Sequence, residues 1–205
     1  MAGRVARRPH RAGYSASSCV CGLQPCLSPH CVAFDFDKFG GNLVADERSF
    51  APYQGTPEEV SHALLKLAGL QRGETFVDLG CGDGRVLLHA LQRCGAARVI
   101  GWELDPAVFM LAQAHVAARL GEGSALARRV ELHCGDAREA ALHGCDVVAL
   151  YLLPEGHAAL EPHLARQLPR GCGARVVAHG WPVPGWTATQ ELVTPLGARL
   201  YLYQR

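Results

Sequence analysis

The sequence lacks several features that would assign it to a class at once. It contains no uninterrupted apolar run of about 18 residues, so no membrane-spanning helix is predicted. Its ten histidines include no H-E-x-x-H pair or comparable helix-face arrangement, and a catalytic metal is therefore not expected. No internal repeat or long low-complexity block is present, which argues against a repeat architecture. Lysine occurs only as Lys38 and Lys66 among 20 basic residues, a scarcity that we attribute to the base composition of the genome.

Acidic residues are absent before Asp35, whereas arginine and serine are frequent there. This composition is typical of an organellar transit peptide. We therefore expect residues 1–34 to be a disordered or transit-peptide-like segment that directs the protein to the mitochondrion and is then removed. An ordinary basic tail or a misassigned start is the alternative, and either would leave the protein cytoplasmic.

The rest of the chain, residues 35–205, has the size of one domain with one sizeable core. Without the four arginines of the N-terminal segment it carries 16 basic and 19 acidic residues. A body with this charge balance does not attract nucleic acid non-specifically, so no nucleic-acid partner is expected.

Nine cysteines are many for a chain expected in a reducing compartment. Five lie singly in apolar or glycine-rich contexts and are interpreted as small core residues: Cys81, Cys94, Cys134, Cys145 and Cys172. The other four lie near His30, namely Cys19, Cys21, Cys26 and Cys31. Their spacing is not that of a standard zinc knuckle, and zinc binding there is the less favoured alternative.

Apolar runs alternate with helical stretches along the body, as is typical of α/β proteins. Strands are predicted to begin near Thr75, Arg98, Val130, Asp146 and Ala174. A closing pair is predicted over residues 189–194 and 199–203, and the last run has the alternation of an edge or antiparallel strand. The predicted fold is a Rossmann-like, doubly wound seven-stranded sheet, mostly parallel, with a C-terminal antiparallel hairpin.

The most informative segment is Val77–Arg85, which reads V-D-L-G-C-G-D-G-R. The apolar residues before it indicate a buried parallel strand, and Gly80, Gly82 and Gly84 allow a tight turn into a helix that starts near Arg85. A dinucleotide-binding turn has the spacing G-x-G-x-x-G, and Arg85 stands at its last glycine position. Such a turn can also serve only to pack a strand against a helix.

Carboxylates stand at the ends of three successive predicted strands. Asp78 precedes the turn, Glu103 follows it by about twenty residues, as an acid that binds ribose hydroxyls does, and Asp136 follows the third strand. Each acid alone fits a solvated strand end or a turn, but ligands of open α/β sheets bind at these ends. Acids there would repel the pyrophosphate of NAD and attract the sulfonium and ammonium groups of S-adenosyl-L-methionine. We therefore predict S-adenosyl-L-methionine as the cofactor, bound by Asp78, Gly80, Gly82, Gly84, Glu103 and Asp136.

With these motifs the chain resembles the seven-stranded (class I) S-adenosylmethionine-dependent methyltransferases. It is most similar to the mitochondrial family of lysine N-methyltransferases that act on the ATP synthase c subunit and the adenine nucleotide translocase. The similarity covers about residues 50–204, so residues 35–205 would form the methyltransferase domain. The matching segments are Pro52-Tyr53, Thr56-Pro57, Val77–Arg85, Gly101–Pro106, Arg175–Val177 and Pro184–Trp186.

The resemblance implies that the segment before the first helix folds over the methionine end of the cofactor, with Tyr53 and Thr56 supplying hydroxyls. The local pattern also predicts Thr56 as a helix N-cap, Pro57 as the first helical residue and Glu59 as the partner in a capping box.

The run Leu150–Pro154 follows the fourth strand, where this class places its substrate-facing motif. Tyr151 and Glu155 are therefore the candidate catalytic residues, although core packing would account equally well for Tyr151. The run is not the N-P-P-Y motif used on amide or adenine nitrogens, which weakens an assignment to nucleic-acid methylation.

We expect a protein-lysine N-methyltransferase that aligns a neutral amine with the methyl carbon. Glu155 would attract the lysine ammonium, and Leu152, Leu153 and Trp186 would favour its neutral form. The alternatives are a small-molecule N- or O-methyltransferase, a non-catalytic S-adenosylmethionine-binding protein and, third, a nicotinamide oxidoreductase. The expected partner is a protein substrate with a reactive lysine, and the sequence does not indicate an oligomeric state.

Overall fold

The computed structural model describes residues 53–205. The predicted transit-peptide-like segment 1–34, with its four cysteines and His30, lies outside the described residues, as does Pro52. The predicted domain boundary at residue 35 also lies outside them.

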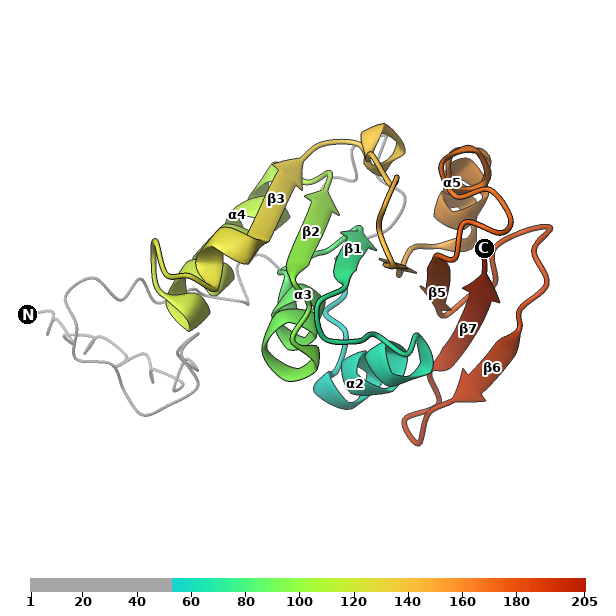
Figure 1. The fold of residues 1–205 in the computed structure, drawn as a ribbon, viewed down its shortest axis with the longest axis horizontal. Coiled ribbons are helices and arrows are strands. Elements are labelled where there is room, and N and C mark those ends of the chain that lie inside the picture. Colours follow the sequence, from blue (N-terminus) through green and yellow to red (C-terminus); the bar gives the residue numbers. More distant parts are fainter. Residues whose placement is uncertain (1–52) are drawn as a thin grey trace, which may run out of the picture. The chain divides into compact units, whose positions relative to one another are not determined.

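The described residues form a seven-stranded sheet in the order β3-β2-β1-β4-β5-β7-β6 (Figure 1). The first five strands in this order are parallel, β7 is antiparallel to β5, and β6 is antiparallel to β7. The strands are β1 Thr75–Leu79, β2 Arg98–Glu103, β3 Val130–Cys134, β4 Val147–Leu150, β5 Arg175–His179, β6 Gln190–Val193 and β7 Arg199–Gln204. The predicted α/β class, the mostly parallel sheet and the antiparallel ending are confirmed.

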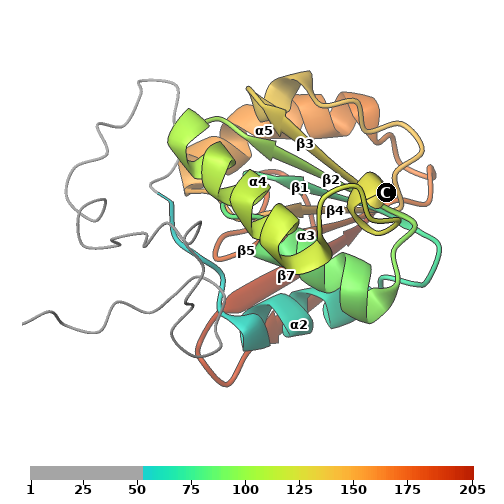
Figure 2. The same cartoon turned by 90° about the vertical axis from the view of Figure 1, so that its left-hand side faces the viewer.

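Helices cover both faces of the sheet, with α2, α3 and α4 on one face and α5 on the other (Figure 2). The α-helices of residues 53–205 are α2 Glu58–Leu67, α3 Arg85–His89, α4 Pro106–Leu120 and α5 Pro154–Gln167. Shorter helical segments are η1 Ala90–Cys94, which has π-helical geometry, and the 3₁₀ turns η2 Ala127–Arg129 and η3 Ala137–Glu139. None of the helices among residues 53–205 is both long and apolar enough to cross a membrane.

The core has two halves because successive residues of a strand point to opposite faces of the sheet. Phe76 of β1 packs with α2 and α3, whereas its neighbour Val77 packs on the other side with Leu160 and Leu164 of α5. All four residues of β4 are buried, as expected for a central parallel strand covered on both faces. Because both faces of the sheet are covered, the strand ends are the part of the sheet that can carry a site.

The capping box predicted at the start of α2 is wrong. The helix begins at Glu58, and Pro57 is its N-cap with φ −55° and ψ 148° and no side-chain capping bond. Because ψ of Pro57 is extended, the chain enters the helix one residue later than the pattern indicated. Thr56 is buried, and its carbonyl accepts a hydrogen bond from Arg85 Nη1 (3.3 Å).

Candidate active site

The carboxyl ends of β1, β2 and β3 lie next to one another in the sheet and bring three acidic residues to one edge. Asp78 lies in β1 opposite Gly101 of β2, Glu103 is the last residue of β2, and Asp136 follows β3. The topology therefore gathers the three predicted cofactor-binding acids, although they are separated by up to 58 positions in the chain.

The glycine turn after β1 is tightly enclosed. Gly80, Gly82 and Gly84 have φ values of 87°, 56° and 76°, a region that residues with a side chain rarely adopt. A Cβ atom at Gly80 would lie 2.8 Å from Leu152 Cδ2, and one at Gly82 would lie 2.7 Å from Tyr53 Cε2. Glycine is thus required here for backbone conformation and for space.

The Glu103 carboxylate is anchored to the glycine turn. Its Oε2 accepts the backbone N–H of Gly82 (3.0 Å), and its Oε1 accepts that of Asp105 (2.9 Å). Burial raises the pKa of Glu103, although these two hydrogen bonds favour its ionised form. The carboxylate is therefore held in a fixed position beside the turn.

Asp78 is buried, with 5 % of its surface exposed. Its pKa lies well above the usual range because of burial first and then because of the negative charges of Glu103 and Asp83. A cation placed among these carboxylates would offset their repulsion. The site thus fits a ligand with positive charge, such as the methionine end of S-adenosylmethionine.

The strap, residues 53–57, crosses the glycine turn and is joined to it through Arg85. Arg85 Nη2 pairs with Asp83 Oδ2 (2.6 Å) and donates to the hydroxyl of Tyr53 (3.4 Å). Burial opposes ionisation of Asp83, but the hydrogen bonds from Arg85 outweigh it, and the pKa of Asp83 is lowered. Burial, together with Asp83, raises the pKa of Tyr53 to about 12, so its hydroxyl keeps its proton at neutral pH.

Asp136 serves as a local capping residue. Its side chain accepts the backbone N–H of Arg138 (2.9 Å) at the start of η3, and it pairs with the Arg138 guanidinium (2.5 Å). Asp136, predicted to bind the cofactor, thus follows β3 and has its carboxylate engaged with Arg138.

A cavity of about 610 Å³ lies beside the carboxyl ends of β4 and β5. Tyr151, directly after β4, and His179, the last residue of β5, both line it. Their rings are stacked with centroids 3.7 Å apart, and the Tyr151 hydroxyl donates to Gln54 Oε1 of the strap (3.1 Å). Trp181, Pro182 and the turn between β6 and β7 close other sides of this cavity.

His179 is a buried, neutral group of the cavity wall. Burial, and next the neighbouring His157, lowers the pKa of His179 to about 4. Its Nδ1 atom is buried and has no hydrogen-bond partner among residues 53–205. Because this nitrogen is buried, it is not exposed to a ligand in the cavity.

Three residues predicted for the acceptor side are not among the residues that line this cavity. Glu155 lies in the first turn of α5 and is exposed, outside the residues that line the cavity. Trp186 is not a lining residue either, because its indole N–H donates to Glu161 (2.8 Å) and its ring packs on Tyr203. Leu152 packs over Gly80 instead of lining the cavity.

Sequence reasoning missed the contributions of Gln54 and Arg85 and did not assign His179 to the site. His179 ends β5 on the same sheet edge as the three acids end their strands. The rule that selected the acids would therefore have selected it. The role of Arg85 carried no comparable signal, because it depends on a strap 32 positions earlier in the sequence.

A mostly parallel seven-stranded sheet with an antiparallel ending, a glycine turn after β1 and acids on three neighbouring strands define an S-adenosylmethionine-dependent class I methyltransferase. Within this class the chain belongs to the family of the ANTKMT methyltransferase domain, whose family model matches residues 78–190. The family assignment makes the protein an enzyme with S-adenosylmethionine as its cofactor.

Two curated relatives and one solved structure illustrate this similarity. A protein-lysine N-methyltransferase of Saccharolobus islandicus is 28% identical over 155 residues, which are 74% of this chain and 92% of the relative. The adenine nucleotide translocase lysine N-methyltransferase of Mus musculus is 38% identical over 136 residues, 66% of this chain and 55% of the relative. The chain thus spans about half the length of the mouse protein.

The solved structure is that of an RNA methyltransferase from Salinibacter ruber in complex with S-adenosyl-L-homocysteine. It is 32% identical, with a TM-score of 0.65, and the match covers 74% of this chain and 93% of that one. The complex shows that a relative of this fold holds the demethylated form of the predicted cofactor.

Proposed function

We propose that the protein transfers a methyl group from S-adenosylmethionine to the ε-amine of a lysine side chain in a protein substrate. The observation that carries this proposal is the aromatic cavity at the ends of β4 and β5, which is lined in part by the strap that covers the glycine turn. The family assignment and the lysine specificity named for the archaeal and mouse relatives support it.

For the cofactor, we assign the three acids and the glycine turn as the binding site. Asp78 and its neighbours provide the negative field for the methionine end, and the anchored Glu103 provides an acceptor for ribose hydroxyls. Tyr53 covers Gly82, so the strap shields this end of the site from water. Asp136, with its neighbouring backbone, is assigned to the adenine end.

For the acceptor, the cavity suits a long side chain with an amine at its tip. A lysine ammonium must lose its proton before it can attack a methyl group, and removal from water lowers its pKa. The stacked rings of Tyr151 and His179 provide an environment of this kind. S-adenosylmethionine supplies an activated methyl group, so the remaining task is to align the neutral amine and exclude water.

His179 then acts as a positioning group and not as a strong base. With a pKa of about 4 it is neutral at physiological pH, and it is too weak a base to remove a proton from an ordinary ammonium. Its ring instead forms, with the stacked ring of Tyr151, one wall of the cavity against which the amine is aligned. Gln54 holds Tyr151 in this position.

RNA is the second candidate acceptor, because the Salinibacter ruber relative is described as an RNA methyltransferase. The two candidates are separated by incubating the purified full chain and radiolabelled S-adenosylmethionine with a cell lysate, which is then divided into protein, RNA and small-molecule fractions. We expect label on lysine in the protein fraction. Label confined to RNA or to metabolites would overturn the lysine proposal, and S-adenosylmethionine binding without any label would indicate a non-catalytic binding protein.

We also propose a mitochondrial location. Its support is the acid-free, arginine-rich composition of residues 1–34 and the relationship to the mouse adenine nucleotide translocase methyltransferase. A fluorescent fusion of the full chain should co-localise with mitochondria, and a fusion that begins at residue 35 should not. A full-length fusion that stays cytosolic would contradict the proposal.

A further inference from the structure

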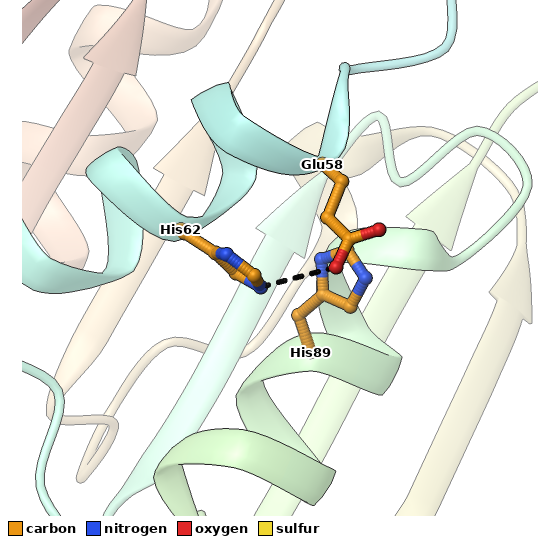
Figure 3. Close-up of side chains that lie close together, drawn as sticks. All are labelled: Glu58, His62 and His89. Atoms are coloured by element: carbon orange, nitrogen blue, oxygen red, sulfur yellow. Dashed lines mark ion pairs between the residues drawn. The ribbon is translucent and has the colours of Figure 1, made fainter.

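Two histidines and a glutamate cluster on α2 and α3, and none of the three lines the acceptor cavity or was assigned to the cofactor. Glu58 and His62 lie one turn apart on α2, and His89 is the last residue of α3 (Figure 3). One potential ligand atom from each of the three lies within 4.8 Å of the others. Two helices that are separate in the sequence thus supply the donors.

The geometry within the cluster fits shared ligation better than direct hydrogen bonding. Glu58 Oε1 and His62 Nε2 are 3.8 Å apart, which is too long for a hydrogen bond. Donors of a tetrahedral zinc ion lie about 2.0–2.1 Å from the metal and therefore about 3.3 Å from one another. Rotation of the exposed Glu58 side chain can shorten its distances to the two imidazoles toward this spacing.

Both histidines have local contacts that favour metal binding. The Ser61 hydroxyl is buried and bonds to His89 Nδ1 (2.8 Å), which fixes the orientation of the ring. His62 Nε2 is buried and has no hydrogen-bond partner among residues 53–205.

Arg93 is the group that competes for this cluster, because its guanidinium pairs with Glu58 Oε1. The side chains of Arg93 and Glu58 are 56% and 59% exposed, and an exposed pair of this kind contributes little stability. Arg93 can therefore turn into solvent when a doubly charged ion takes the carboxylate.

We propose that Glu58, His62 and His89 bind one zinc ion, with water in the remaining coordination position. Two imidazoles and one carboxylate are a donor set that zinc accepts in proteins. The ion would join the first turns of α2 to the end of α3. Because α2 follows the strap directly, the ion would also fix the helix from which the strap extends.

The test compares full-length proteins, so that zinc bound by the N-terminal cysteines is the same in every sample. Wild type, the His62→Ala/His89→Ala double variant and a His143→Ala control, which removes an exposed histidine elsewhere, are equilibrated with zinc and analysed for bound metal. We expect the double variant to bind one equivalent less than wild type and the control to match wild type. Thermal unfolding should show a zinc-dependent rise that the double variant has lost.

Two further variants keep the proposal testable if the double variant folds poorly. Ser61→Ala removes the hydrogen bond to His89 and should weaken zinc binding roughly 10- to 100-fold, as loss of an orienting partner does. Arg93→Ala removes the competing cation and should tighten binding. Equal zinc stoichiometry and affinity in wild type, the double variant and Arg93→Ala would overturn the proposal.

Discussion

The ring of Tyr151 stacks on the ring of His179 with 3.7 Å between centroids and 25° between planes. Tyr151 directly follows β4 and His179 is the last residue of the neighbouring parallel strand β5, so the stack closes one wall of the cavity at the same sheet edge as the acids. The sheet topology thus brings together the two residues to which we assign the methyl acceptor.

The Tyr151 hydroxyl should matter for methyl transfer and not for cofactor binding. Tyr151→Phe keeps the stacked ring but removes the hydrogen bond to Gln54, a loss of about 1 kcal/mol and roughly fivefold in turnover. Tyr151→Ala, which also removes the stack, should lose more. Steady-state kinetics and calorimetry with S-adenosylmethionine separate the two effects, and an unchanged rate for both variants would remove Tyr151 from the acceptor site.

A side chain at Gly82 should displace the strap. In Gly82→Ala the new Cβ would lie 2.7 Å from Tyr53 Cε2, so the Tyr53 ring must move off the turn, and S-adenosylmethionine affinity should fall by roughly tenfold or more. Gly144→Ala is the matched control, since Gly144 also has a positive φ of 76° but no atom within 4 Å of the new Cβ. Both variants carry a backbone cost of about 1 kcal/mol. If calorimetry gave equal cofactor affinities for the two, the turn would not be the binding site.

The Glu103 carboxylate should contribute directly to cofactor affinity. Glu103→Gln loses charge-assisted hydrogen bonds worth about 1.5–3 kcal/mol, which corresponds to roughly tenfold or more in dissociation constant. Glu139→Gln removes the same charge from an exposed position on η3 and should leave affinity unchanged. Equal affinities for the two variants would argue that Glu103 only anchors Gly82.

Asp78 should give the cofactor-free protein a characteristic pH dependence. Its pKa is raised in the folded state, so the folded protein retains a proton that the unfolded chain has lost. Stability should therefore fall as pH rises from the ordinary carboxyl pKa of 3.8 through the raised folded value. Asp78→Asn cannot ionise and should lack this part of the decline, while binding S-adenosylmethionine more weakly. Urea unfolding across pH tests this, and identical pH curves for variant and wild type would contradict it.

The strand positions could be predicted closely because they depend on local apolar runs. The segments beginning at Thr75, Arg98 and Val130 are strands in the structure, and the closing pair differs from prediction by a residue at its ends. The start of α2 was predicted less accurately. Thr56 and Pro57 match the residue pattern of a helix start, whereas the backbone of Pro57 is extended. Sequence pattern reports which residues favour a cap and not the dihedral angles that decide it.

Side-chain partners formed by packing between distant elements were the least predictable. Trp186 was predicted to lie at the acceptor pocket. In the structure it packs against Tyr203 and Glu161, which lie 17 and 25 positions away in the sequence. The same limit applies to the cluster of His62 and His89, which exists only because α2 and α3 lie side by side. Spacing along the chain carries no direct record of such contacts.

The proposed function depends most directly on the identity of the methyl acceptor. The most direct measurement is mass spectrometry of proteins from cells with the gene, without it, and without it but expressing Gly82→Ala. We predict that a specific lysine methylation is present in the first cells, absent in the second and reduced in the third. Unchanged lysine methylation in all three, with loss of a methyl mark on RNA or on a metabolite, would contradict the proposed function while leaving the cofactor site intact.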